Sequence, residues 1–544
     1  MNRVILVITG IIAALIVAIG VVIVILVATG GGSGEEGREE GELRLLGAEP
    51  ITLDPAIAQD SSSAVYIVEI FDGLVTLDPE LQIQPDLAAE IPTTENGGKV
   101  VNGDGTVTYT FHLRERLLFH DRKPVTADDV KFSLERAADP ATQSLVAEFF
   151  LGDIVGFDEK LNGDAAEISG VTVIDAATVA ITIERDLPSF LYKLTYPTAY
   201  VVDQSQVESD DNWTRRPNGT GPFALDQWHL GVRIELKAND NYHLGAPSLK
   251  KVTYLLTGDG ITLYEAGDID ATGVALDVLE RVQDPSEQLN EDYRTGERLA
   301  LDYLGFNTNS PPFDDPNVRL AFAMAIDKEK IASSIFKGAV PVANSIDIPG
   351  MPAYNPAAQA PQFDPVRARQ LLEESEYGGA SDLPPIILAE SGTGATSGPG
   401  TTAIVDMWRE NLGVEVEIAQ AETATFFQDV SSGIYQAFIL GWIMDYPDEE
   451  NLINLHFDSE SPNNDTFYSN PEVDGLLRQA LLETDQQRRT QLYQQAEQIV
   501  LDDVPWFPLF FDRYHVLIRP NVQNYLVPAT IVPRLRYITL TPPQ

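Results

Sequence analysis

Apolar and polar residues alternate with a period of two through much of the first half of the chain. The clearest run is residues 106–113 (Thr-Val-Thr-Tyr-Thr-Phe-His-Leu), and residues 178–183 and 232–237 are also predicted to be strands. This period is typical of strands that bury one face. Asn102-Gly103-Asp104-Gly105, just before the first run, is a hairpin-type turn signal rather than a calcium loop, since the remaining oxygen ligands are missing. The first half therefore predicts mainly antiparallel strands.

The pattern changes after residue 306, where short apolar runs alternate with amphipathic segments of helical period. Residues 318–336 predict a long amphipathic helix, and Asp364-Pro365 predicts an N-cap followed by a first-turn proline. A strand-helix-strand-helix-strand series follows, at residues 385–389, 401–412, 414–419, 423–430 and 435–442. Such alternation is typical of a parallel sheet with crossover helices, so the chain is expected to have an α/β fold.

Residues 4–28 form an uncharged stretch of mainly Val, Ile, Leu and Ala. At 1.5 Å per residue it would span roughly 37 Å, which exceeds a bilayer core of about 30 Å. We expect one transmembrane anchor in residues 1–29, with the N-terminus cytoplasmic because Arg3 precedes the stretch and acidic residues follow it. The alternative is a cleaved signal peptide, whose apolar region is usually shorter. Residues 30–42 predict a flexible acidic linker.

The chain is strongly acidic and has no cysteine. Its 82 Asp and Glu residues against 36 Lys and Arg residues give a formal net charge of −46 among 544 residues. Nucleic acid and anionic lipid surfaces need basic partners, so neither is expected to bind directly. The absence of cysteine excludes disulfides, thiolate chemistry and acylation at a cysteine.

No catalytic motif is present. The sequence lacks Gly-x-Ser-x-Gly, His-Glu-x-x-His, a Walker loop and a dinucleotide fingerprint. The Gly-rich residues 391–398 have no lysine and are interpreted as a surface loop. Six histidines are scattered without ligand spacing: His112, His120, His229, His243, His456 and His515. We therefore expect neither an enzyme nor a metal or other cofactor.

One carboxylate directly follows the last apolar run. Residues 435–442 read Tyr-Gln-Ala-Phe-Ile-Leu-Gly-Trp, and Ile-Met-Asp-Tyr-Pro-Asp comes next, which predicts a buried strand ending in a turn. Asp445 is thus expected at the carboxyl end of a strand, where open α/β sheets bind ligands. It is a candidate counter-ion for a cationic ligand. The alternative is an aspartate that hydrogen-bonds the backbone amides of its own turn.

Seven motifs in order along the chain carry a resemblance to a family. They are Glu49-Pro-Ile-Thr-Leu-Asp-Pro55, Phe71-Asp-Gly-Leu-Val-Thr-Leu-Asp78, Thr110-Phe-His-Leu-Arg114, Pro124-Val-Thr-Ala-Asp-Asp-Val-Lys-Phe-Ser133, Gly219-Thr-Gly-Pro-Phe223, Gly305-Phe-Asn307 and Gly441-Trp-Ile-Met-Asp-Tyr-Pro-Asp448. From about residue 42 to about residue 537 the chain resembles the extracellular solute-binding proteins of ABC importers, in the oligopeptide, dipeptide and nickel class (family 5).

The resemblance implies a two-lobed periplasmic-binding-protein-like fold with an extra inserted domain. Expected lobe I comprises residues 43–71, 200–300 and 510–544, the inserted domain II residues 72–199, and lobe III, with the parallel sheet, residues 301–509. Residues 298–303 and the late return at residues 507–518 would connect the lobes as a hinge.

The resemblance also implies a site and partners. Asp445 would pair with the α-ammonium of a short peptide, with backbone contacts from Gln59, Asp60 and Ser61 on one side and from Gly441, Trp442 and Ile443 on the other. Some oligopeptide binders have an arginine two residues before the Gly-Trp pair, where this chain has Ile439, so recognition of a peptide carboxylate there is not expected.

The protein is expected to be a monomeric, membrane-anchored, extracytoplasmic component that delivers peptides to an ABC transporter permease and ATPase complex. Two alternatives stay open. The same fold could bind another solute, such as a nickel complex or an oligosaccharide, or the chain could be a membrane-anchored sensor ectodomain.

Overall fold

The computed structural model describes residues 38–392, 397–527 and 529–542. The chain divides into two compact units, Met1–Glu42 and Leu43–Gln544, and the elements below belong to the second except for the first residue of β1. No helix within the described residues is long and apolar enough to cross a membrane. The anchor expected in residues 1–29 lies outside the described residues, as does most of the expected linker.

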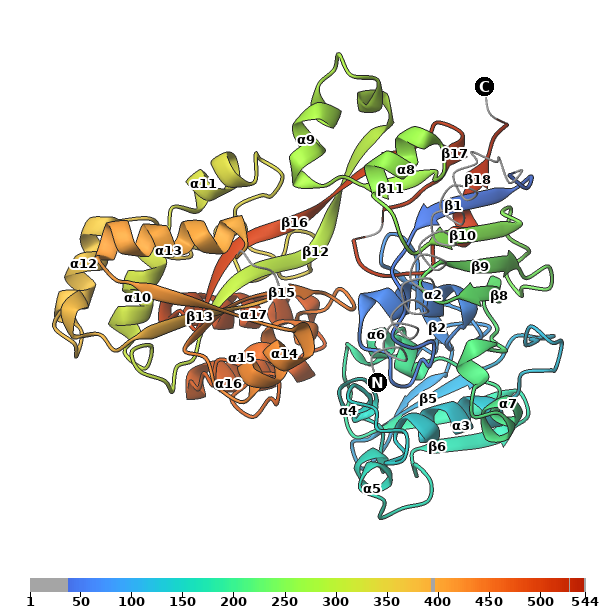
Figure 1. Cartoon of the computed structure of the whole chain (residues 1–544). Helices are drawn as coiled ribbons and strands as arrows, with labels where there is room; N and C mark the ends of the chain where they lie inside the picture. The colour runs from blue at the N-terminus through green and yellow to red at the C-terminus, as the bar shows by residue number, and fades with distance from the viewer. Residues whose placement is uncertain (1–37, 393–396, 528, 543–544) are drawn as a thin grey trace, which may run out of the picture. The chain divides into compact units, whose positions relative to one another are not determined.

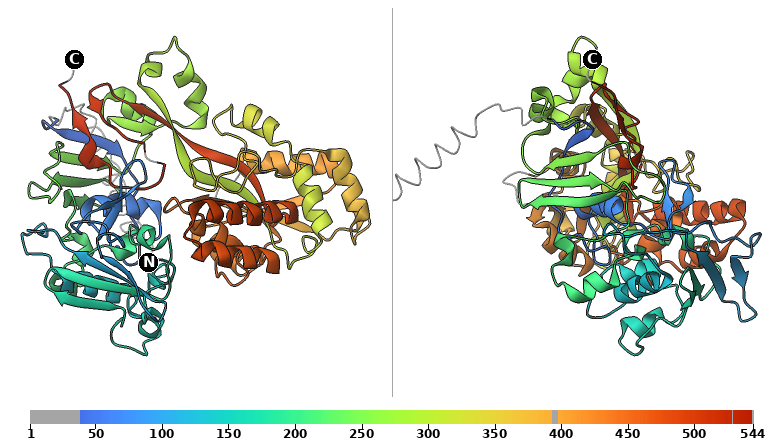
Figure 2. Two further views of the ribbon diagram at one scale, coloured as in Figure 1. Left: turned by 180° about the vertical axis from the view of Figure 1, so that it is seen from behind. Right: turned by 90° about the vertical axis from the view of Figure 1, so that its right-hand side faces the viewer.

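One ten-stranded sheet organises the second unit, in the order β14-β13-β15-β12-β16-β11-β1-β10-β9-β8. Its middle consists of two long strands, β12 (Tyr293–Phe306) and β16 (Trp506–Ile518), which pair antiparallel along most of their length (Figure 1). Figure 2 shows the same pair from behind. These strands include the two predicted crossing segments, residues 298–303 in β12 and residues 507–518 in β16.

On one side of β12 and β16 the sheet is antiparallel at its outer edge. The strands there are β1 (Glu42–Leu46), β8 (Phe223–His229), β9 (Arg233–Ala238), β10 (Lys251–Leu255) and β11 (Ala271–Gly273). β8, β9 and β10 form an antiparallel meander, and β1 runs parallel to β11. Helix α2 (Ser61–Ile70) contributes Tyr66 and Ile67 to a buried cluster with residues of β1, β9 and β10.

On the other side the sheet is parallel, as the strand-helix alternation predicts. β13 (Ile386–Ser391) pairs parallel with both β14 (Val416–Ala421) and β15 (Ala437–Ile443). The helices of this part are α10 (Pro316–Met324), α12 (Pro365–Glu374), α13 (Pro399–Leu412), α14 (Thr423–Ser431), α15 (Ile453–Phe457), α16 (Pro471–Leu482) and α17 (Gln486–Asp503). They share one large apolar core with β12, β13 and β15.

A separate four-stranded antiparallel sheet lies in the first half, in the order β4-β5-β7-β6. Its strands are β4 (Lys99–Val101), β5 (Val107–His112), β6 (Val171–Asp175) and β7 (Thr178–Ile183). Helices α3 (Ala127–Ala137), α4 (Ala147–Leu151) and α6 (Phe190–Lys193) pack with it in a second core. Thr126 is the N-cap of α3 and forms a capping box with Asp129.

The long helix predicted for residues 318–336 is wrong. α10 ends at Met324, and Asp327 then starts a new short segment, α11 (Lys328–Lys330), by accepting a hydrogen bond from the backbone N–H of Lys330. An aspartate at this position caps a helix start more readily than it continues a helix. The apolar periodicity continues across the break because Ala325, Ile326, Ile331 and Ala332, on either side of α11, join the same core as α10.

Candidate functional site

β15 ends with the residues of the Gly-Trp motif. Its first two residues, Ala437 and Phe438, pair with β13, whereas the whole strand from Ala437 to Ile443 pairs with β12. Beyond Phe438, no described residue pairs with β15 on the side away from β12, which leaves the edge of residues 440–443 outside any strand ladder. The sequence predicted a buried strand, but this half of β15 is partly exposed because one of its edges is open. Unpaired backbone groups along a strand edge can accept an added strand.

Asp445 lies two residues beyond β15 and is half-buried. Its Oδ2 accepts a hydrogen bond of 2.9 Å from the side-chain amide of Asn451, and its backbone N–H donates to Oδ1 of Asn451 at 2.8 Å. Among the described residues nothing donates to the other carboxylate oxygen, and no backbone amide bonds the side chain. Burial raises the pKa of Asp445 to about 6, although the hydrogen bond from Asn451 lowers it.

Gln59, Asp60 and Ser61 stand at the start of α2. Asp60 is the N-cap and accepts from the backbone N–H of Ser63 at 2.8 Å, so Ser61 belongs to the first turn of the helix rather than to a loop. Gln59 is exposed, and no described residue hydrogen-bonds its backbone or side chain. Its peptide groups are therefore available to a ligand.

Tyr196 brings the two sets of predicted residues together. Its hydroxyl donates to the carbonyl of Ala58 at 3.5 Å, beside Gln59. Burial raises the pKa of Tyr196 well above its usual value, and the negative charges of Asp445 and Asp60 raise it further. The carboxylates of Asp445 and Asp60 therefore both lie close enough to Tyr196 to raise the pKa of its hydroxyl. Tyr196 could not be predicted from the sequence, because its role depends on contacts with residues far away in the chain.

The indole N–H of Trp442 donates no hydrogen bond to any described residue. This Nε1 atom is buried and has no hydrogen-bond partner among the described residues. The indole packs edge-on against the imidazole of His456 in α15, with ring centroids 4.5 Å apart. Burial lowers the pKa of His456 to about 4, so this imidazole is neutral at physiological pH.

Two sets of ion pairs hold the turn after Asp445 in place. Arg489 of α17 forms two hydrogen bonds with the carboxylate of Asp448, of 2.6 and 2.7 Å. Farther on, Glu450 forms an ion pair of 2.7 Å with Lys193 of α6, and Lys193 also bonds Asp153 at 2.8 Å. All of these groups except Asp153 are nearly fully buried.

Tyr446, the residue next to Asp445, packs outside the apolar core that contains the residues of β15. Its ring stacks on Tyr192 and meets Phe150 edge-on, with centroid distances of 6.1 and 6.3 Å. Phe150 in turn stacks on Tyr196 at 3.7 Å. Tyr446 is fully buried in the core built mainly from residues 74–201. The segment that carries Asp445 therefore also joins the parallel part of the structure to the four-stranded sheet and its helices.

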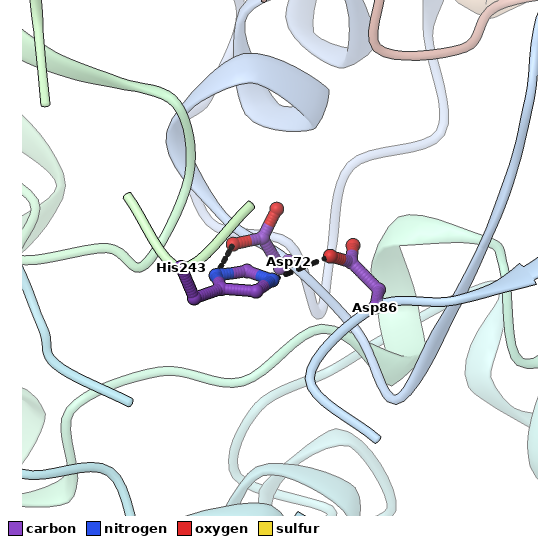
Figure 3. A group of neighbouring side chains, drawn as sticks. All are labelled: Asp72, Asp86 and His243. Atoms are coloured by element: carbon purple, nitrogen blue, oxygen red, sulfur yellow. Dashed lines mark hydrogen bonds and ion pairs between the residues drawn. The ribbon is translucent and has the colours of Figure 1, made fainter. Parts of the chain in front are cut away.

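A second group of titratable residues lies elsewhere. Asp72, Asp86 and His243 place one potential ligand atom each within 4.8 Å of one another (Figure 3). The imidazole lies between the carboxylates, with Nε2 3.0 Å from Asp86 and Nδ1 3.9 Å from Asp72. Burial raises the pKa of Asp72 to about 7 and that of Asp86 to about 6, while the charge of Arg536 lowers both. Since the two nitrogens face different carboxylates and an arginine is near both, the group fits a buried polar network, and we assign it no ligand.

Sequence comparisons relate this chain to bacterial solute-binding proteins. The family model of bacterial extracellular solute-binding proteins, family 5 (middle region), matches residues 82–464. The chain is 27% identical over 521 residues to the oligopeptide-binding protein OppA of Bacillus subtilis (strain 168), covering 92% of this chain and 94% of that protein. It is also 27% identical over 492 residues to the probable deoxycholate-binding periplasmic protein YgiS of Escherichia coli (strain K12), with coverage of 88% and 89%.

Among solved structures, the Escherichia coli murein tripeptide binding protein MppA is similar over nearly its whole length. The TM-score is 0.77 at 26% sequence identity, and the match covers 92% of this chain and 98% of that one. The ten-stranded sheet and the four-stranded sheet described above therefore correspond to a two-lobed periplasmic-binding-protein-like α/β fold.

Proposed function

Because this chain belongs to the bacterial extracellular solute-binding proteins, family 5, we propose that it captures short peptides and delivers them to the permease of an ABC importer. The B. subtilis relative is named an oligopeptide-binding protein, and the similar E. coli structure is of a murein tripeptide binding protein. The observation that carries the proposal is the open edge of β15, which ends two residues before a carboxylate that no cation of the described chain neutralises.

An extended peptide fits both features. It would add to the open edge of Gly441, Trp442 and Ile443 as a short strand, and backbone pairing of this kind reads no side chains. Its α-ammonium would pair with Asp445. Across from β15 it would meet Gln59, Asp60, Ser61 and the hydroxyl of Tyr196.

The division into lobes remains part of the proposal. Residues 43–71, 200–300 and 510–544 would form lobe I, residues 72–199 the inserted domain, and residues 301–509 lobe III. Three separate apolar clusters support this division, each drawn largely from one of these groups. We further propose that residues 1–29 anchor a monomer to the cell membrane with the binding lobes outside, on the evidence of the uncharged stretch at residues 4–28.

Asp445→Asn tests the central contact. The variant keeps the side-chain shape and the hydrogen bond with Asn451 while removing the charge. Loss of one member of a desolvated ion pair typically costs about 3 to 5 kcal/mol, or about 10² to 10³ in affinity. Calorimetry should show this loss for peptides with a free amino terminus and only a small change for the same peptides N-acetylated.

Two outcomes would count against the proposal. Equal affinity of wild type and Asp445→Asn for a free-amine peptide, with melting temperatures unchanged, would remove Asp445 from the site.

A second candidate function is binding of a different solute, which the name of the deoxycholate-binding relative favours. Mass spectrometry of the ligand released from purified, denatured protein separates the two, since recovery of a steroid, chelate or sugar without peptide would replace the first function with the second.

A further inference from the structure

Asp302 lies on β12 directly opposite Gly441 of β15. Opposite residues of an antiparallel pair project to the same face of a sheet. A Cβ atom added to Gly441 would stand only 2.6 Å from Oδ1 of Asp302, and no other side chain comes as close to that position. The carboxylate of Asp302 therefore leans over the glycine, toward the strand whose far edge is open.

This carboxylate has no partner of its own. No described residue donates a hydrogen bond to the carboxylate of Asp302 or forms an ion pair with it. The nearby guanidinium of Arg298 instead bonds Asp512, at 2.5 Å. Burial raises the pKa of Asp302 to about 6, the charge of Asp512 raises it further and Arg298 lowers it. Asp302 is nonetheless exposed to solvent, so a ligand cation could reach it.

We propose that Asp302 selects peptides that carry a lysine or arginine at the position lying beside Gly441. The inference rests on the proposed function, because it needs a peptide paired with the open edge of β15. Neighbouring strands are about 4.8 Å apart, and every second side chain of an added strand projects to the face that Asp302 occupies. A long basic side chain on that face can extend back over Gly441 to the carboxylate, because glycine leaves the path free.

The absence of a side chain at Gly441 is as important as the carboxylate itself. Any other residue there would place its Cβ against Asp302 and separate it from the ligand strand. Asp302 and Asp445 would then serve different ligand groups. Asp445 receives the α-ammonium common to all free peptides, whereas Asp302 discriminates among side chains.

The test uses two series of peptides of equal length. In one series lysine is placed at each position in turn, and in the other norleucine replaces it, which keeps the aliphatic stem without the charge. Affinities are measured by calorimetry for the wild type, for Asp302→Asn and for a control, Glu417→Gln. Glu417 is an exposed carboxylate of β14 in the same part of the fold. Norleucine peptides also report whether each variant remains folded and competent to bind.

At one peptide position the wild type is expected to prefer lysine over norleucine by about 10- to 100-fold, the usual range for a charge-assisted hydrogen bond. Asp302→Asn should lose this preference and keep its affinity for norleucine peptides, while Glu417→Gln should keep both. If peptides bind without a lysine preference at any position, or if Asp302→Asn retains the preference, the inference is overturned and the proposed function stands. If no peptide of either series binds, the proposed function fails and the inference fails with it.

Discussion

Glu69, on α2, is a buried carboxylate that fastens the C-terminal segment. Its Oε1 accepts hydrogen bonds from the backbone N–H groups of Arg534 and Leu535, of 2.8 and 3.0 Å. Its other oxygen is buried without a hydrogen-bond partner among the described residues. Burial raises the pKa of Glu69 from 4.5 to about 7, and the two N–H donors and the charges of Arg534 and Arg536 lower it.

The raised pKa of Glu69 determines whether the stability of the folded protein increases or decreases with pH. The folded protein binds this proton more tightly than the unfolded chain does, so the contribution of Glu69 to the free energy of unfolding increases as the pH falls from about 7 to 4.5. Glu69→Gln keeps the acceptor oxygen and removes the charge. The variant should be more stable than the wild type at pH 8 by up to about 3 kcal/mol, with no gain near pH 4.

Urea unfolding at a series of pH values measures this difference. A stability difference between Glu69→Gln and wild type that stays constant from pH 4 to pH 8 would contradict the prediction. Asp104→Asn, at an exposed turn, is a suitable control, because its pKa lies below the usual value and its titration falls outside this range.

At the scale of elements, the short turn after β15 performs two tasks. Asp445 faces the proposed peptide, and Glu450, five residues on, forms a buried ion pair with Lys193 of α6. Between them Tyr446 packs on Tyr192 and Phe150. Binding at Asp445 and contact with the region around α6 are thus built on one stretch of backbone, which Arg489 and Asn451 hold in place.

Glu450→Gln is expected to shorten the lifetime of the peptide complex. Lys193 keeps Asp153 as a partner, so the loss should be less than that of a fully unpaired charge, about 1 to 3 kcal/mol. Stopped-flow measurements should show peptide dissociation about 10- to 100-fold faster, with little change in the association rate. Asp139→Asn removes a comparable but more exposed pair with Lys160 and should leave dissociation unchanged. A dissociation rate equal to that of the wild type would show that this ion pair does not help to retain the ligand.

The sequence predicted those elements whose signal is local. The parallel β13, β14 and β15 follow from apolar runs separated by helical periods, and the cap at Asp364 follows from the proline after it. The sequence also predicted that Asp445 follows a strand. It could not predict the roles of Tyr196, Asp302 and the Lys193–Glu450 pair, because each role depends on a contact with a residue far away in the chain. Nor could the pattern show that β15 leaves β13 after two paired residues.

At the scale of the whole molecule, the net charge of −46 should affect how fast ligands arrive. An acidic surface raises the local concentration of cations, and salt screens this attraction as the Debye length shrinks from about 10 Å at 0.1 M to about 3 Å at 1 M. The association rate of a lysine-containing peptide with a free amino terminus should fall several-fold between these salt concentrations.

Stopped-flow association of the norleucine analogue, N-acetylated and C-amidated, gives the comparison, since this peptide carries no charge and its rate should hardly depend on salt. Equal salt dependence of the two peptides would contradict a role for the surface charge.

The interior location of the open edge of β15 has a consequence for self-association. Exposed strand edges are templates for edge-to-edge aggregation between protein molecules. Here the open edge of residues 440–443 lies between β12 and the point where β13 diverges, rather than at either outer edge of the sheet. Because β13 lies on that side of β15, we expect the sheet edge of a second molecule to have less room to align there than the end of a free peptide has. The same backbone groups can thus bind ligands without promoting self-association of the protein.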